Sequence, residues 1–190
     1  GRGWRSHRIV LHVGGAESVH AVYVNGAFAG YGTDSRLPSE YDITDLVVGG
    51  DNQLAIVVLR YSAHSYVEDQ DQWWMAGLHR GVFIEARSTV GIGDVVAIAD
   101  HDPGTGAGSL TVRTSVAFHA APTPGYRVRT WLETLGGRRI GAAHEGEVPH
   151  VHAAPYLFHG HHVVATWPSV RADPWSAESP RQYRVVVELL

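Results

Sequence analysis

The chain contains no cysteine and no lysine, and it has a single methionine among its 190 residues. Without cysteine it has no disulfide framework, no thiolate metal site and no thiol nucleophile. All 15 basic residues are arginine. We interpret this first as codon usage, and only second as a sign of carboxylate recognition. These absences exclude several classes of catalytic and metal site.

Long apolar runs and a positive net charge are also missing. No run approaches the roughly 18 apolar residues of a membrane span, and the first five residues, GRGWR, do not have the pattern of a signal peptide. The formal net charge of -4 argues against nucleic acid or an anionic membrane as a partner. We therefore expect a soluble, cytoplasmic chain with no nucleic-acid or membrane partner.

Short apolar runs predict an all-β first half. They occur at 9–13, 18–24, 28–32, 54–61 and 82–86. Asn25-Gly26 separates the second run from the third and is a strong signal for a type I′ turn, so residues 22–31 are predicted to form a hairpin. The nearly continuous run at 54–61 predicts a strand that is buried on both faces.

The pattern changes near residue 88. From there, predicted strands follow at fairly regular intervals, at 94–99, 110–118, 126–135, 140–143, 163–167 and 183–189. Turns rich in Gly and Pro separate them, as in an immunoglobulin-like sandwich, which has about seven strands in about 100 residues. We therefore predict two all-β domains, one over residues 1–88 and an immunoglobulin-like β-sandwich over residues 89–190.

An acidic-aromatic segment lies just before this boundary, around residues 65–83. It contains three carboxylates and two adjacent tryptophans: Glu68, Asp69, Asp71, Trp73 and Trp74. A polar, aromatic-lined cleft is the simplest interpretation of this mixture. The carboxylates suit a hard cation or a polyhydroxylated ligand, although a solvated acidic turn explains them equally well. Adjacent tryptophans are more often packing residues than sugar platforms, so we expect them to hold the loop against its neighbours.

Five histidines are concentrated in the second half: His150, His152, His159, His161 and His162. Neutral imidazoles are common ligands of Zn²⁺ and Ni²⁺. However, no thiolate or well-placed carboxylate completes a familiar ligand set, and a polar strand face or loop is the better interpretation. A Gly-x-Ser-x-Gly elbow is missing, and sequence spacing does not identify a pair of catalytic carboxylates. We therefore assign no catalytic residue.

Four segments carry specific motifs. They are DSRLPSEYDIT at 34–44, the hairpin at 22–31, YVEDQDQW at 66–73 and PWSAESP at 174–180. Together they resemble family 2 glycoside hydrolases of the β-galactosidase type, in which the third segment lines the active site and the fourth closes the second domain. The resemblance covers essentially the whole chain. The Glu-Asp-Gln-Asp loop is similar to that of β-galactosidases, whereas the related β-glucuronidases carry a different segment there.

The resemblance implies a jelly-roll (galactose-binding-like) sugar-binding domain, an immunoglobulin-like domain and then a (β/α)₈ barrel with both catalytic glutamates. On this comparison the chain begins partway into the jelly roll, without its first strands, and stops before the barrel. In the family, the second Asp of the loop holds sugar hydroxyls and a sodium ion, a role that corresponds to Asp71. The magnesium ligands belong to the barrel. Trp74, His79 and Gly81 depart from the family pattern, which affects the shape of the loop and the sugar preference.

We therefore expect a non-catalytic fragment of a retaining β-galactosidase, inactive by itself, that binds the β-galactoside through Asp71. Sodium and magnesium are implied for the intact enzyme, as are the catalytic barrel as a partner and a homo-oligomeric state. A free-standing carbohydrate-binding module and a β-glucuronidase-type family member are the alternatives.

Overall fold

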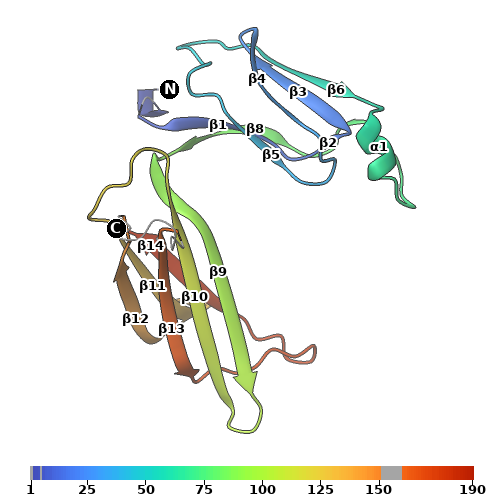
Figure 1. Cartoon of the computed structure of the whole chain (residues 1–190). Coiled ribbons are helices and arrows are strands. Elements are labelled where there is room, and N and C mark those ends of the chain that lie inside the picture. Colours follow the sequence, from blue (N-terminus) through green and yellow to red (C-terminus); the bar gives the residue numbers. More distant parts are fainter. Residues whose placement is uncertain (1, 5, 151–159) are drawn as a thin grey trace. The chain divides into compact units, whose positions relative to one another are not determined.

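The computed structural model describes residues 2–4, 6–150 and 160–190 of the chain (Figure 1). They divide into two compact units, Gly1–Ser88 and Thr89–Leu190, which we call unit 1 and unit 2. Nearly all regular secondary structure in the described part of both units is β-strand, which confirms the predicted all-β fold. Within the described residues, no helix is both long enough and apolar enough to cross a membrane.

The described residues of unit 1 form eight strands and two short helices. In chain order they are η1 Arg2–Trp4, β1 Arg8–Val13, β2 Ala16–Glu17, β3 Val19–Val24, β4 Ala27–Gly32, β5 Ser39–Asp42, β6 Leu54–Leu59, α1 Ala63–Val67, β7 Gly77–Leu78 and β8 Val82–Arg87.

These strands form a sandwich of two three-stranded antiparallel sheets (Figure 1). One sheet has the order β5-β1-β8 and the other has the order β4-β3-β6, while β2 and β7 form a separate pair. Alternate residues of β1 and β3 point inward, so that Leu11, Val13 and Val22 are completely buried. Ile56 of β6 and Val82 of β8 pack against the same cluster. The apolar core therefore lies between the two sheets.

The predicted hairpin between β3 and β4 is confirmed. Asn25 and Gly26 have positive φ angles of 51° and 82°, the conformation that a type I′ turn requires at both central positions. The side-chain amide of Asn25 also donates to the carbonyl of Leu46 at 2.9 Å and to Oδ1 of Asn52 at 2.8 Å. The turn is thus fixed both by its local sequence and by its neighbours.

The prediction that the run at 54–61 is buried on both faces is wrong. Ile56 and Val58 pack against the core, whereas Val57 and Leu59 are exposed. The reason is that β6 is an edge strand of the sheet β4-β3-β6, and only one face of this sheet is covered within unit 1. A continuous apolar run does not distinguish a doubly covered strand from a strand with an apolar outer face.

A buried histidine connects the two sheets of unit 1. His20 on β3 is 1% exposed, and its Nε2 lies 2.8 Å from the hydroxyl of Tyr41 on β5. The other ring nitrogen, Nδ1, is buried and has no hydrogen-bond partner among the described residues. Burial lowers the pKa of His20 below its ordinary value of 6.5, because the charged imidazolium would lose its hydration.

We expect His20 to make unit 1 less stable in mild acid. As the pH falls through about 6.5 the unfolded chain gains a proton at His20, whereas the folded unit gains it only at a lower pKa. Stability that is present above pH 6.5 is therefore lost as the pH falls through the folded pKa. His20→Gln should flatten this dependence by up to about 1.4 kcal/mol per pH unit. Urea unfolding of both proteins at about pH 7.5 and about pH 5.5 measures the difference, and equal pH dependence would contradict the expectation.

Unit 2 contains six strands among its described residues. They are β9 Val90–Asp102, β10 Ala107–Phe118, β11 Arg127–Thr134, β12 Arg139–Glu147, β13 His162–Val170 and β14 Tyr183–Leu189.

Two three-stranded antiparallel sheets form this unit, with the orders β13-β10-β9 and β12-β11-β14. Val112 of β10, Leu132 of β11 and Trp167 of β13 belong to one buried cluster between them. The indole N–H of Trp167 donates to the carbonyl of Ala142 at 3.0 Å, so the single polar atom of this side chain is satisfied. The result is the β-sandwich predicted for this half. β9 extends well beyond the predicted 94–99, because pairing with β10 continues through residues that are exposed.

Candidate functional site

The acidic-aromatic segment begins within α1, which is capped by the serines Ser62 and Ser65. The hydroxyl of Ser62 accepts from the N–H of His64 at 3.2 Å, and the hydroxyl of Ser65 accepts from the N–H of Ser62 at 3.1 Å, a capping-box arrangement. The same two hydroxyls contact Oγ of Ser18 at 2.8 and 3.3 Å. The helix is thereby attached to the segment between β2 and β3.

Glu68 attaches the beginning of the loop to the turn before β5. Its Oε1 accepts from the N–H of Ser35 at 3.1 Å, and its Oε2 accepts from the Ser35 hydroxyl. The turn itself is held by Asp34, whose Oδ1 accepts the N–H groups of Leu37 and Arg36 at 2.8 and 2.7 Å. These hydrogen bonds lower the pKa of Asp34. In this structure Glu68 is a positioning carboxylate, in contrast to the ligand role considered from the sequence.

The end of the loop is attached through a carboxylate that motif analysis does not find. Glu17 of β2 is 8% exposed, and its Oε2 accepts from the N–H of Met75 at 3.3 Å and from Nη1 of Arg36 at 3.3 Å. In the sequence, Glu17 is a single acid between two small residues, Ala16 and Ser18. Its importance comes from burial, which leaves no mark in the sequence.

His79 anchors the chain just after β7. Its N–H donates to the carbonyl of Gly15 at 3.2 Å, and its Nε2 lies 2.8 Å from the carbonyl oxygen of Ser35. The imidazole packs so closely on Gly15 that a Cβ there would lie 2.5 Å from the ring. His79, one of the residues at which this chain departs from the family pattern, therefore attaches the end of the loop to the rest of unit 1.

The residues between these attachment points face solvent. Asp71 is exposed, and no hydrogen bond or ion pair connects it to another residue that the structure describes. Asp69 is also exposed, and with Gln72 and Trp74 it lines a pocket of about 10 Å³, which is room for about one water molecule. The loop thus presents Asp71 on a fixed base, but the pocket beside it is too small for a sugar.

The two tryptophans differ in their surroundings. Trp74 is 45% exposed and packs against Tyr61, with ring centroids 6.1 Å apart, which fits the expectation that it holds the loop in place. Trp73 is 88% exposed, so the same expectation is wrong for this residue. Its position on the loop leaves almost no protein surface for it to cover, and the indole is accessible to a ligand or to another part of a protein.

The histidine cluster is described only in part, because His152 and His159 lie outside the described residues. His161 and His162 turn their Nδ1 atoms to a backbone carbonyl and a serine hydroxyl, at 2.6 and 2.9 Å. Within residues 2–4, 6–150 and 160–190, no three His, Asp or Glu side chains are grouped so as to hold a metal ion. The described part of the cluster therefore offers no metal site.

Comparison with known proteins connects this loop and fold to one family. Residues 2–87, nearly all of unit 1, match the model of the sugar binding domain of glycosyl hydrolases family 2. The chain is 32% identical over 190 residues to a beta-galactosidase of Psychromonas ingrahamii, a match that covers 98% of this chain and 18% of the relative. It is 36% identical over 177 residues to a beta-galactosidase of Vibrio vulnificus strain YJ016, covering 93% and 17%. The chain thus spans less than a fifth of the length of these relatives.

Solved structures show the same fold. The chain is similar to the beta-glucuronidase of Bacteroides uniformis with a TM-score of 0.79 and 18% identity, over 100% of this chain and 23% of that one. It is similar to the Bifidobacterium dentium beta-glucuronidase complexed with coumarin-3-O-glucuronide with a TM-score of 0.75 and 18% identity, over 100% and 35%. The match over residues 2–87 assigns unit 1 to the sugar binding domain of glycosyl hydrolases family 2. The whole chain is similar in sequence to part of the beta-galactosidases named above.

Proposed function

We propose that this chain is the non-catalytic β-domain part of a larger retaining β-galactosidase, to whose active site it contributes Asp71. The observation that carries the proposal is the state of Asp71. It is exposed and without a partner among the described residues, on a loop held at both ends by partly buried hydrogen bonds of Glu68 and Glu17. A carboxylate presented in this way accepts hydrogen bonds from sugar hydroxyls at little cost in loop order. The names of the relatives support a β-galactoside as the sugar.

Sodium fits the chemistry of Asp71 but not a site made by this chain alone. A carboxylate oxygen is a suitable ligand for a hard cation. Among the described residues, however, no group of three or more acidic or histidine side chains surrounds a common point. In the proposed enzyme Asp71 would supply one ligand, and the remaining oxygen atoms would come from the sugar and from other parts of the protein. No residue of this chain is proposed to bind magnesium.

The outer face of the sheet β4-β3-β6 supports a place within a larger protein. The strand register puts Ala21 opposite both Tyr31 and Val57, and it puts Tyr23 opposite Phe28. Tyr31, Val57 and Phe28 are exposed, so a contiguous apolar surface spans three strands. Independent soluble domains rarely expose such a surface. We propose that other parts of the longer enzyme cover it, either the catalytic barrel or a second subunit of a homo-oligomer.

A free-standing sugar-binding module is the second candidate, and the exposure of Trp73 favours it. An indole that is 88% exposed beside a carboxylate has the character of a sugar platform. The two functions differ in whether the 190-residue chain binds galactose by itself.

The expected result is that the isolated chain neither binds nor hydrolyses galactosides. Calorimetric titration with galactose should give no saturable heat, because the pocket beside the loop is too small for a sugar. A nitrophenyl β-galactoside should release no chromophore, because the proposed role includes neither the acid nor the nucleophile of the two-carboxylate mechanism. Saturable binding that is lost in Trp73→Ala would instead establish the module, and hydrolysis by the purified chain would overturn the proposed function.

A further inference from the structure

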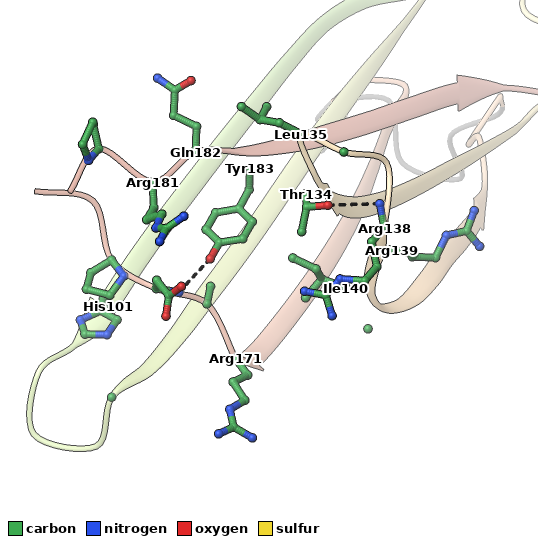
Figure 2. Close-up of a pocket in the computed structure, with 17 residues that line it drawn as sticks. His101, Thr134, Leu135, Arg138, Arg139, Ile140, Arg171, Arg181, Gln182 and Tyr183 are labelled. Atoms are coloured by element: carbon green, nitrogen blue, oxygen red, sulfur yellow. Dashed lines mark hydrogen bonds between the residues drawn. The ribbon is translucent and has the colours of Figure 1, made fainter.

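A pocket of about 1130 Å³ lies within unit 2, far from the acidic-aromatic loop in the sequence. Three segments line it: the turn between β9 and β10, the turn between β11 and β12, and the stretch from the end of β13 to the start of β14 (Figure 2). Its volume is slightly above the usual range of small-molecule sites, which is about 300–1,000 Å³. The pocket is therefore large enough for a ligand with several functional groups.

Four arginines line this pocket, together with one carboxylate. They are Arg138, Arg139, Arg171 and Arg181, and the carboxylate belongs to Asp173. None of the four guanidinium groups has a carboxylate oxygen within 4.0 Å among the described residues, whereas Arg127, Arg129 and Arg184 of the same unit are all paired. The pocket therefore carries an excess of positive charge that the described part of the protein leaves uncompensated.

The turn that carries two of these arginines is well defined. The N–H of Arg138 donates to Oγ1 of Thr134 at 3.2 Å, and the N–H of Thr134 donates back to the carbonyl of Arg138 at 2.9 Å. The guanidinium of Arg139 lies 4.8 Å from the ring centroid of Trp131, a cation–π contact with a residue that does not line the pocket. Arg139 therefore contributes less to the charge inside the pocket than Arg138 does. Glu133, which pairs with Arg139 in the strand register, directs its carboxylate to Trp131 and Arg184 instead.

The other wall of the pocket is also ordered. The hydroxyl of Tyr183 accepts from the N–H of Asp173 at 2.8 Å (Figure 2). This hydrogen bond fixes the phenol ring, which lines the pocket together with Ile140 and Leu135. The apolar side chains of this lining can contact the carbon skeleton of a ligand. The surrounding arginines can bind its acidic substituents.

We propose that this pocket binds a small polyanion that carries at least two carboxylate or phosphate groups. The planar guanidinium group recognises both oxyanions through paired N–H donors. Figure 2 shows Arg138 and Arg181 on different sides of the pocket, whereas the side chain of Arg171 extends away from it. Two well-separated charges on one molecule can therefore engage Arg138 and Arg181 together. The net charge of -4 for the whole chain and the concave shape favour a small molecule over nucleic acid. The site is independent of Asp71 and of the proposed galactosidase role.

Calorimetric titration of the 190-residue chain with citrate, pyrophosphate and acetate tests this proposal. Citrate or pyrophosphate should bind saturably, and which of the two binds more tightly distinguishes a carboxylate ligand from a phosphate ligand. Acetate, with a single charge, should bind at least about ten-fold more weakly, because each additional charge-assisted hydrogen bond strengthens binding by about that factor or more. Raising the salt to about 1 M should abolish the binding, since the Debye length is then about 3 Å.

Matched variants connect the binding to the pocket. The double variant Arg138→Gln/Arg181→Gln should weaken the polyanion by at least about ten-fold. Arg113→Gln should leave the affinity unchanged, because Arg113 on β10 is exposed, does not line the pocket and also has no carboxylate partner among the described residues. All of these side chains are exposed, so the variants should fold, which circular dichroism checks. The absence of saturable binding by citrate and pyrophosphate, or equal losses in Arg113→Gln and the double variant, would overturn the proposal.

Discussion

Replacement of Leu11 by alanine is expected to lower the free energy of unfolding of unit 1 by about 2–5 kcal/mol. Leu11 lies at the centre of β1, is 0% exposed and belongs to the cluster between the two sheets. Truncation removes apolar contacts and leaves a cavity that the strands on either side, β5 and β8, cannot easily fill, because their ladders with β1 fix its position. Hydrogen exchange of unit 1 peptides as a function of urea, resolved by mass spectrometry, measures this loss separately from unit 2.

Leu59→Ala is the matched control, because it removes the same atoms from the apolar run of β6. Leu59 is 53% exposed on the outer face of the sheet β4-β3-β6, so its truncation should cost less than about 1 kcal/mol in the isolated chain. If β6 were buried on both faces, as its sequence predicts, the two variants would lose similar amounts. Similar losses would therefore show that the outer face is covered, for example by a second copy of the chain.

The strands of this protein are largely predictable because their signals are local. The β3–β4 turn is determined by Asn25 and Gly26, which adopt the required positive φ angles without strain. The position of β6 is also predictable, whereas its environment is not. Whether Val57 faces solvent depends on what lies over the sheet, and no property of residues 54–61 contains that information. Residue type is also insufficient for Trp73. A tryptophan is expected to pack against other residues, but the position of Trp73 on the loop leaves it exposed.

The residues that hold the loop in place are harder to predict from the sequence than the loop itself. The acidic-aromatic composition marks the segment, and the family resemblance singles out Asp71. Glu68 has the same residue type as its neighbours, yet it turns inward to Ser35, a contact between residues 33 positions apart. Glu17 contacts Met75 over 58 positions. Such pairs become visible only when the fold brings them together, so sequence patterns identify exposed motifs more readily than the residues that hold them.

The arginine pocket was missed for a related reason. Codon usage is the simplest explanation of the arginine-only composition, and nothing in the sequence separates paired arginines from unpaired ones. Arg138 comes from the turn between β11 and β12, whereas Arg171 and Arg181 come from the stretch between β13 and β14, and the fold brings these two segments together. Carboxylate recognition, the second interpretation of that composition, becomes specific only when these three positions are placed in space.

In the longer enzyme that carries these residues, Asp71→Asn is expected to reduce kcat/KM for a nitrophenyl β-galactoside by about ten- to hundred-fold. This is the effect of losing one hydrogen bond between a charged acceptor and the sugar, about 1.5–3 kcal/mol. The dependence of the rate on sodium concentration should weaken in the same variant, because asparagine keeps an oxygen ligand but loses the negative charge. Assays across a sodium titration measure both effects.

Two variants of the same loop separate this role from a general effect of charge or order. Asp69→Asn removes an equal charge two residues away and should change kcat/KM by less than about three-fold, since exposed charges interact weakly through water. Glu68→Gln weakens the attachment to Ser35 and should lower the stability of the isolated chain by about 1 kcal/mol. Asp71→Asn should leave that stability unchanged, because Asp71 has no partner among the described residues to lose. If Asp71→Asn lowered the stability of the chain but left the sodium dependence of the rate unchanged, the carboxylate of Asp71 would have a structural role in the loop and would not bind the sugar.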